Sequence, residues 1–211
     1  MKITVLGTGH MGAALAVALQ RTQHEIYLRG SKERSITCIN LCKSLNLKEA
    51  QVHDLFESDI IFFVMPSSFI ESAAAKLQGF NGIILSVVGI DNYLTDESKS
   101  SISASETIAQ LIPTAKIVHG FTWMSAETVQ DSNKMIKPSV AHCSDDSEAL
   151  DKVCNLTQEM GFKPVRAGRL INARFAEAAG FLWGAIAIEE GYGLDSFFEV
   201  HLENDATYNI S

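Results

Sequence analysis

The sequence predicts an α/β fold with a doubly wound, mainly parallel sheet. Short apolar runs typical of buried strands alternate along the chain with stretches whose apolar residues recur at helical spacing. The first strand-like run, at 2–6, leads directly into the glycine-rich string G-T-G-H-M-G at 7–12, and an apolar helical stretch at 13–19 follows at once. This order of strand, glycines and helix makes the expected fold Rossmann-type.

Apolar spacing places the other elements of the N-terminal part. The continuous apolar run at 60–64 is expected to be a central parallel strand, because such strands are buried on both faces. A serine after Pro66 is expected to cap the next helix, with Phe69, Ala73 and Leu77 on its buried face. The remaining expected elements here are strands at 25–28 and 83–88 and a more polar helix at 32–45.

The second part continues the alternation after a serine-rich and charged stretch at 89–105, which is expected to be a loop. The expected elements are helices at 106–111 and 147–160 and strands at 116–119, 139–143 and 163–165. No interdomain linker is visible. We therefore expect a single domain over 1–211, with a nucleotide-binding core at 1–166 and a short helical segment at 167–211.

The stretch at 170–190 is expected to be one helix that is apolar on nearly every face. Such a helix must be buried, either in the core or in a subunit interface. Gly180 and Gly184 would allow close helix–helix approach. We favour a homodimer contact over purely internal packing.

The glycine string has the spacing that a dinucleotide site requires. Gly7 permits the tight turn, Gly9 lets the backbone approach a pyrophosphate, and Gly12 lets the helix pack closely on the strand. The free N–H groups and the dipole of the helix start would attract the phosphates. The alternative is a turn without a ligand, although a plain turn does not need the backbone entropy that three glycines lose.

The residues after the second strand favour NADP over NAD. NAD sites place an acidic residue about 20 residues beyond the first glycine. This chain instead has Arg29, Ser31, Lys32 and Arg34, with Glu33 as the local exception. A hydroxyl and several cations suit a 2′-phosphate. The alternative interpretation is a solvated basic turn.

Five segments together resemble one family. They are the glycine string at 7–12, G-S-K at 30–32, F-F-V-M-P at 62–66, H-G-F-T at 119–122 and G-R-L-I-N-A-R-F-A-E at 168–177. The family is that of the NADP oxidoreductases of the deazaflavin-coenzyme-dependent type, to which the cytosolic domains of six-transmembrane ferric reductases look similar. The resemblance implies a Rossmann domain with a short helical segment, a dimer, and hydride transfer between NADPH and a flat partner such as a flavin or deazaflavin.

The resemblance also implies contacts to the cofactor at matching positions. These are Thr8, His10 and Met11 on the pyrophosphate, Ser31 and Lys32 on the 2′-phosphate, and Val64, Met65 and Pro66 along the ribose and nicotinamide. Two segments depart from the family. Ser86 to Ile90, with Gly89 as a further expected cofactor contact, looks more like pyrroline-carboxylate reductases, and Thr122 replaces an asparagine.

No catalytic triad or carboxylate pair is apparent in the sequence. Hydride transfer between stacked rings needs positioning more than an acid or base. His119, at a predicted strand end, is a weak candidate for a catalytic residue, and a structural histidine is the favoured alternative. Phe121, Trp123 and Met124 could form an apolar platform for the acceptor or belong to the core.

The function expected is therefore that of an NADPH-dependent oxidoreductase acting on a flavin-like, deazaflavin-like or other small acceptor. Two alternatives remain open. One is an imine or 2-oxo reductase that resembles pyrroline-carboxylate reductase. The other is an NADPH-binding sensor without catalysis.

Composition bounds the partners and the compartment. The net charge of −8 argues against nucleic-acid binding. The longest apolar run, at 178–188, is much shorter than the roughly 18 residues of a membrane span. Four cysteines without a C-x-x-C pair fit reduced thiols better than a metal site. With no secretory signal visible, we expect a cytoplasmic protein without a metal or membrane partner.

Overall fold

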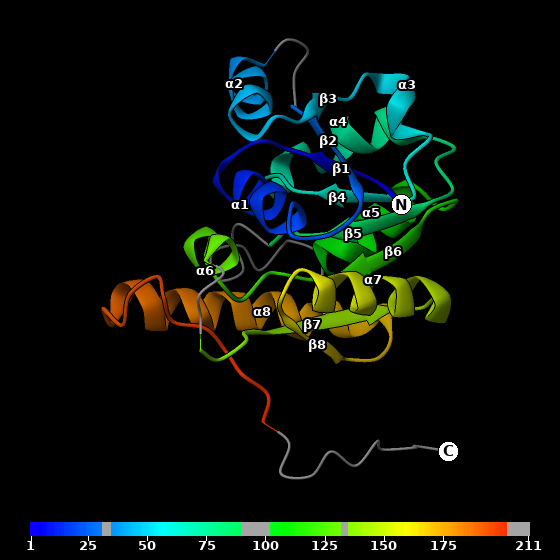
Figure 1. Ribbon diagram of the computed structural model, residues 1–211. Helices are drawn as coiled ribbons and strands as arrows, with labels where there is room; N and C mark the ends of the chain where they lie inside the picture. Colours follow the sequence, from blue (N-terminus) through cyan, green and yellow to red (C-terminus); the bar gives the residue numbers. More distant parts are fainter. Residues whose placement is uncertain (31–34, 90–101, 132–134, 202–211) are drawn as a thin grey trace.

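A single twisted sheet organises the molecule, as expected from the sequence (Figure 1). The computed structural model describes residues 1–30, 35–89, 102–131 and 135–201. Its eight strands lie in the order β3-β2-β1-β4-β5-β6-β7-β8. Among these described strands, β6 and β7 pair antiparallel and the other neighbours pair parallel. The prediction of an α/β fold with a mainly parallel, doubly wound sheet is confirmed.

The strands are β1 (Lys2–Leu6), β2 (Glu25–Arg29), β3 (Lys48–Glu49), β4 (Ile60–Phe63), β5 (Ile83–Ser86), β6 (Lys116–His119), β7 (Ser139–Ser144) and β8 (Lys163–Arg166). The α-helices are α1 (His10–Leu19), α2 (Ile36–Leu45), α3 (Val52–Leu55), α4 (Ile70–Ala74), α5 (Ala104–Leu111), α6 (Ala126–Gln130), α7 (Ser147–Glu159) and α8 (Ala173–Gly184). Short 3₁₀ turns at Ser67–Phe69, Ala75–Leu77 and Leu170–Asn172 and a π-helical turn at Ala185–Glu189 complete the helical elements described.

Alternate residues of the strands enter two cores on opposite faces of the sheet. Phe62 and Leu85 belong to the core that α1, α2, α6 and α7 cover. Phe63 and Ile84 belong to the core that α3, α4 and α5 cover. β4 has a strand on either side and a core on each face, so its residues are fully buried, as predicted for a central parallel strand.

The helix after β4 differs from the prediction in its start and its buried face. The predicted serine cap is wrong, since Pro66 precedes a 3₁₀ turn and makes no side-chain capping bond. Because this turn is tighter than an α-helix, it rotates the following residues about the axis. Ile70 and Ala74 are therefore buried, whereas Phe69 is exposed and Ala73 is half-buried; the predicted burial of Leu77 is confirmed.

Two further boundaries differ from the prediction. Ser103, within the predicted loop, caps α5 together with Glu106, so this helix begins two residues earlier than predicted. Residues 90–101 of the predicted loop lie outside the described ranges. The predicted single helix at 170–190 is three successive helical pieces that end at residue 189. From 190 to 201 the chain forms turns and extended segments, and Phe197 bridges to Met124.

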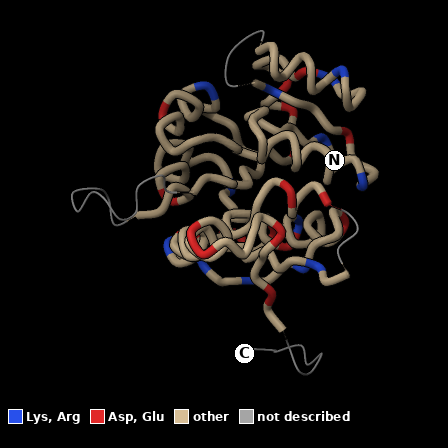
Figure 2. Tube along the Cα trace, turned by 90° about the vertical axis from the view of Figure 1, so that its left-hand side faces the viewer, with Lys and Arg blue, Asp and Glu red and all other residues tan. Residues whose placement is uncertain are grey.

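Acidic and basic residues are interspersed along the described part of the chain (Figure 2).

Candidate functional site

The glycine turn joins β1 to α1 through close backbone contacts. Gly7 has a φ of +115°, and a Cβ atom there would lie 1.7 Å from the Val64 carbonyl oxygen. A Cβ at Gly12 would lie 1.9 Å from the Gly7 carbonyl oxygen. Because no side chain fits at either position, these two glycines hold α1 close to the ends of β1 and β4.

Gly9 differs from the other two glycines because its surroundings are open. It is the exposed N-cap of α1, and a Cβ atom there would meet nothing within 4 Å. Among the described residues, no side chain caps the start of this helix. The free N–H groups of its first turn therefore lack a side-chain acceptor, as expected where a phosphate is to bind. These features fit a dinucleotide pyrophosphate.

The sheet register places several strand ends beside this turn. Leu6 of β1 pairs with Arg29 of β2 and with Phe63 of β4, and Phe63 in turn pairs with Ser86 of β5. Ser86 pairs with His119 of β6. The segments that leave these strands therefore start along one edge, where ligands of doubly wound folds bind.

The predicted cofactor residues in the described ranges lie along this edge. Gly7, Thr8, Gly12, Arg29 and Val64 are buried, Met11 and Met65 are half-buried, and Gly9, His10, Pro66 and Gly89 are exposed. His10 lies 3.4 Å from the Glu127 carboxylate at the start of α6. Ser31, Lys32 and Arg34 lie outside the described residues, so their predicted contact with a 2′-phosphate stays a prediction.

Arg29 has a structural partner that the sequence did not predict. Its guanidinium donates a hydrogen bond of 3.0 Å to the Ala50 carbonyl oxygen, and the residue is 6% exposed. The same residue lines a small cavity of about 40 Å³ with Leu6, Gly30 and Met65. This cavity lies at the ends of β1, β2 and β4, next to the predicted position of the ribose.

At β5 and β6, the sheet is covered by a cluster of buried polar side chains. Glu177 of α8 accepts hydrogen bonds from the backbone N–H groups of Ala104 (2.9 Å) and Ser105 (3.2 Å) at the start of α5. The Ser105 hydroxyl lies 3.2 Å from Glu177 Oε1 and 2.9 Å from His119 Nδ1. His119 Nε2 lies 3.0 Å from the Thr122 hydroxyl. A side chain from α8 thus caps the first turn of α5.

Burial controls the protonation of this cluster. It raises the pKa of Glu177 to about 7, although hydrogen bonds from the two backbone N–H groups oppose the shift. Burial also lowers the pKa of His119 to about 3, with His142 adding to the effect. His119 is fully buried and both ring nitrogens have hydrogen-bond partners, which favours the structural interpretation of this residue over direct contact with a substrate.

The residues predicted as an apolar platform are mostly part of the core. Phe121 and Met124 are each 2% exposed, and the Trp123 indole N–H donates to the Ser139 carbonyl oxygen. Phe121 has a φ of +59°, and its ring packs against Phe162 with centroids 5.3 Å apart. This left-handed turn at the end of β6 directs Thr122 back toward His119.

An ion pair that the sequence did not predict lies next to the cluster. Arg174 of α8 forms two hydrogen bonds of 2.8 and 2.7 Å with Glu106 of α5. Glu106 is also the partner of Ser103 in the capping box, and Arg174 holds its pKa down at about 2. Both charged residues of the A-R-F-A-E segment at 173–177 are visible in the sequence, but the sequence does not show which helix they contact.

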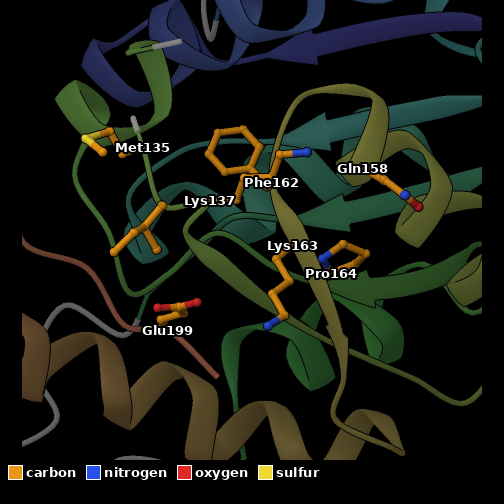
Figure 3. A pocket seen from close by; sticks show the side chains of 8 residues that line it. Met135, Lys137, Gln158, Phe162, Lys163, Pro164 and Glu199 are labelled. Atoms are coloured by element: carbon orange, nitrogen blue, oxygen red, sulfur yellow. The ribbon is translucent and has the colours of Figure 1, made fainter. Parts of the chain in front are cut away.

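A separate cavity of about 440 Å³ lies where α7 meets β8 (Figure 3). Its lining residues are Met135, Ile136, Lys137, Gln158, Phe162, Lys163, Pro164 and Glu199. None of its lining residues belongs to the predicted cofactor site. That site is built around the glycine turn between β1 and α1, whereas this cavity lies beside β8.

The fold and the glycine turn together place the chain in the Rossmann-type class of proteins. More particularly, residues 2–88 match the family model described as NADP oxidoreductase, coenzyme F420-dependent. This match confirms, over that part of the chain, the resemblance seen in the sequence.

Solved structures show the same fold. A candidate F420-dependent NADP reductase from Arthrobacter sp. FB24 aligns with a TM-score of 0.76 and 21% identity, over 96% of this chain and 100% of that one. A hypothetical protein from Sinorhizobium meliloti aligns with a TM-score of 0.71 and 18% identity, over 82% of this chain and 87% of the other. The 1-pyrroline-5-carboxylate reductase of Streptococcus pyogenes aligns with a TM-score of 0.57 and 20% identity, over 78% and 57% of the two chains.

Within the described ranges, none of the helices has the length and hydrophobicity that a membrane span requires. No group of three or more His, Cys, Asp or Glu in the same ranges is arranged to hold a metal ion.

Proposed function

We propose that this protein is an NADPH-dependent oxidoreductase that transfers a hydride between NADP(H) and a flavin-like or deazaflavin-like ring. The glycine turn carries the proposal. Gly7 and Gly12 fix the start of α1 against the strand ends, while Gly9 leaves the uncapped helix start open to a pyrophosphate. The family match over residues 2–88 supports NADP as the dinucleotide.

The protein's contribution to the reaction is positioning. The nicotinamide supplies or accepts the hydride. Val64, Met65 and Pro66 follow β4 and would orient the ring, and Gly89 follows β5 on the neighbouring strand. Ser31, Lys32 and Arg34 would select the 2′-phosphate. Two charge-assisted hydrogen bonds of about 1.5–3 kcal/mol each would favour NADPH over NADH by a hundredfold or more.

The test has two stages. Fluorescence titration should show NADPH binding more tightly than NADH, and Lys32→Ala should weaken NADPH binding while leaving NADH binding unchanged. NADPH oxidation is then followed with a flavin, a deazaflavin, a quinone and pyrroline-5-carboxylate in turn. Equal affinity for the two dinucleotides would refute the NADP assignment.

The acceptor that supports turnover separates the alternatives. Turnover with pyrroline-5-carboxylate and not with the rings would favour an imine reductase, in line with the Ser86 to Ile90 segment and the structural similarity to the Streptococcus pyogenes enzyme. Tight NADPH binding without turnover on any acceptor would favour a sensor.

We also propose a homodimer. Ile171, Phe175 and Leu182 lie at helical spacing on and just before α8 and are 46%, 74% and 57% exposed. A second copy would cover this apolar face. Light scattering after size exclusion should give twice the chain mass, and Phe175→Glu should give the mass of one chain.

A further inference from the structure

Four polar side chains form a continuous row between α8 and the end of β6. Glu177, Ser105 and His119 are each no more than 1% exposed, whereas Thr122 keeps part of its surface accessible. The row therefore has one fully buried end, the Glu177 carboxyl group, and one end at a half-buried residue, Thr122. His119 Nδ1 and Glu177 Oε1 are 3.7 Å apart, so the Ser105 hydroxyl has to connect them.

Two arrangements of protons satisfy the distances in this row. When Glu177 is ionised, Ser105 donates to Oε1, His119 donates from Nδ1 to Ser105, and Thr122 donates to Nε2. When Glu177 is protonated, it donates to Ser105, Ser105 donates to Nδ1, and His119 donates from Nε2 to Thr122. The Thr122 hydroxyl then donates to the Ala176 carbonyl oxygen at 3.3 Å, or to a ligand in its place.

The Thr122 end of the row lies near the predicted position of the hydride acceptor. Thr122 follows the carboxyl end of β6, and β6 is two strands away from β4. Two strand spacings amount to about 10 Å. A flat ring stacked on a nicotinamide beside Met65 would therefore extend toward Thr122.

We propose that Glu177, Ser105, His119 and Thr122 form a proton relay that delivers to the acceptor the proton its reduction consumes. Thr122 is the catalytic residue that touches the acceptor, and the other three act through it. The inference rests on the proposed function and extends it to an acceptor with a proton-accepting heteroatom, such as a flavin or deazaflavin nitrogen.

The proton balance closes within the row. Glu177 gives its proton to Ser105 while Ser105 passes its own to His119 Nδ1. His119 passes the Nε2 proton to Thr122, and Thr122 passes its hydroxyl proton to the acceptor atom that has gained the hydride electrons. The row ends with Glu177 ionised and the His119 tautomer reversed. After the product leaves, a proton from water enters at Thr122, and the same transfers in reverse restore Glu177.

The ionisable neighbours are consistent with this role. The pKa of Glu177, raised to about 7 by burial, gives it a proton to lose near neutral pH. The low pKa of His119 keeps its ring neutral, so the ring passes a proton without storing charge. Among the described residues, the other titratable groups that interact with these two are Glu106 of α5 and His142 and Cys143 of β7, and Arg174 of α8 pairs with Glu106. Burial lowers the pKa of His142 to about 4, and Arg174 is paired with Glu106, which leaves Glu177 as the group that titrates near pH 7.

The first experiment needs no turnover. Nitrogen-15 NMR of the histidine rings, with His119 assigned from its absence in His119→Gln, should show the ring proton moving from Nε2 to Nδ1 as pH rises through about 7. Glu177→Gln should hold one tautomer throughout. Arg174→Met, which removes the neighbouring ion pair with Glu106 but no member of the row, should retain the switch. A His119 tautomer that stays constant from pH 5 to 9 in the wild type would overturn the relay whatever the enzyme does.

The second experiment uses turnover with the best ring acceptor. Thr122→Val should lower kcat by about 100-fold, the size of a general-acid contribution, while the Kd for NADPH stays within twofold. Thr122→Ser should restore most of the rate. The wild-type kcat should fall above about pH 7 with a solvent deuterium isotope effect, and both features should disappear in Glu177→Gln.

The outcomes separate the relay from the proposed function. If the wild type reduces the acceptor and Thr122→Val does so at the same rate, the relay is wrong and the oxidoreductase stands. If the tautomer switches but no acceptor is reduced, the oxidoreductase proposal fails, and the row loses its catalytic role with it.

Discussion

The edge of the sheet has two regions that are built on opposite principles. At β1, β2 and β4, the contacts are made by backbone, glycines allow the close approach, and the start of α1 lacks a side-chain cap. At β5 and β6, a carboxylate from α8 caps the start of α5, and polar side chains fill the buried space. The first region leaves its helix start open for a ligand, whereas the second satisfies its helix start internally.

This difference predicts how each region responds to substitution. Glycine substitutions in the first region should act through backbone clashes or through ligand binding. Side-chain substitutions in the second region should act through pH-dependent stability. The predictions below test this contrast and are ordered by their expected effect on the free energy of unfolding.

Gly7→Ala should have the largest effect. The added Cβ would lie 1.7 Å from a backbone oxygen at a φ of +115°, so we expect a loss of at least about 4 kcal/mol, or failure to fold. Urea unfolding measures the loss. Gly79→Ala is the matched control, since Gly79 also has a positive φ, of +83°, but has open space around it. Equal losses for the two variants would show that the contact with Val64 is unimportant.

Glu177 should make stability fall as pH rises. Its pKa is about 7 in the folded protein and near 4.5 in an unfolded chain, so the folded state binds this proton more tightly. The contribution is fully present below pH 4.5 and is lost as pH rises through about 7, by about 3 kcal/mol. The buried histidines act in the opposite direction below pH 6.5. Subtracting the Glu177→Gln stability from that of the wild type at each pH isolates the carboxyl group, and a flat difference between pH 5 and 8 would contradict the prediction.

Arg174→Met should have a smaller effect. The pair with Glu106 is partly exposed, so we expect a loss of about 1–2 kcal/mol at pH 7. Because the pKa of Glu106 is lowered to about 2, the loss should shrink as pH falls from 4.5 toward 2. A double-mutant cycle with Glu106→Gln measures the coupling. Additive losses would mean that the two side chains do not interact in solution.

Gly9→Ala should leave stability within about 0.5 kcal/mol of the wild type, because the added Cβ meets nothing within 4 Å. NADPH affinity should nevertheless fall at least tenfold, since the methyl group would lie where the pyrophosphate approaches. Thermal unfolding and fluorescence titration give the two numbers. Gly184→Ala is the control, because its added Cβ also meets nothing within 4 Å; it should lower neither stability nor NADPH affinity. Unchanged NADPH binding in Gly9→Ala would place the phosphates elsewhere.

The sequence predicted the glycine turn of the first region but not the side-chain contacts of the second, and the cofactor contacts of the first region stay predictions. The spacing of Gly7, Gly9 and Gly12 is local, and each glycine acts through the backbone of its own turn. The carboxyl cap of α5 comes from Glu177, which is 72 residues beyond Ser105. A contact between residues so far apart in the sequence leaves no local sequence pattern from which it could be predicted. The motif at 173–177 was visible, but its partners depend on how α8 packs.

Within the first region, the predictions failed where helix type mattered. A serine after Pro66 was a reasonable N-cap, but the chain forms a 3₁₀ turn that needs no serine side chain. Propensity does not distinguish these two starts, because the difference depends on how Ile70 and Leu77 reach the core. In the second region, the prediction that His119 lies at a strand end is confirmed, yet its complete burial follows from α5 and α8 together.

The left-handed turn at Phe121 links the two faces of the sheet. Along a regular strand, residues 119 and 121 would point to the same face. The φ of +59° instead sends the Phe121 ring into the core beneath α1 and α7 and returns Thr122 to His119 on the opposite face. The position of a hydroxyl on one side of the sheet is thereby mechanically coupled to how an aromatic ring is seated on the other. Repacking around Phe162 would therefore shift the position of Thr122, even with the residues that surround Thr122 unchanged.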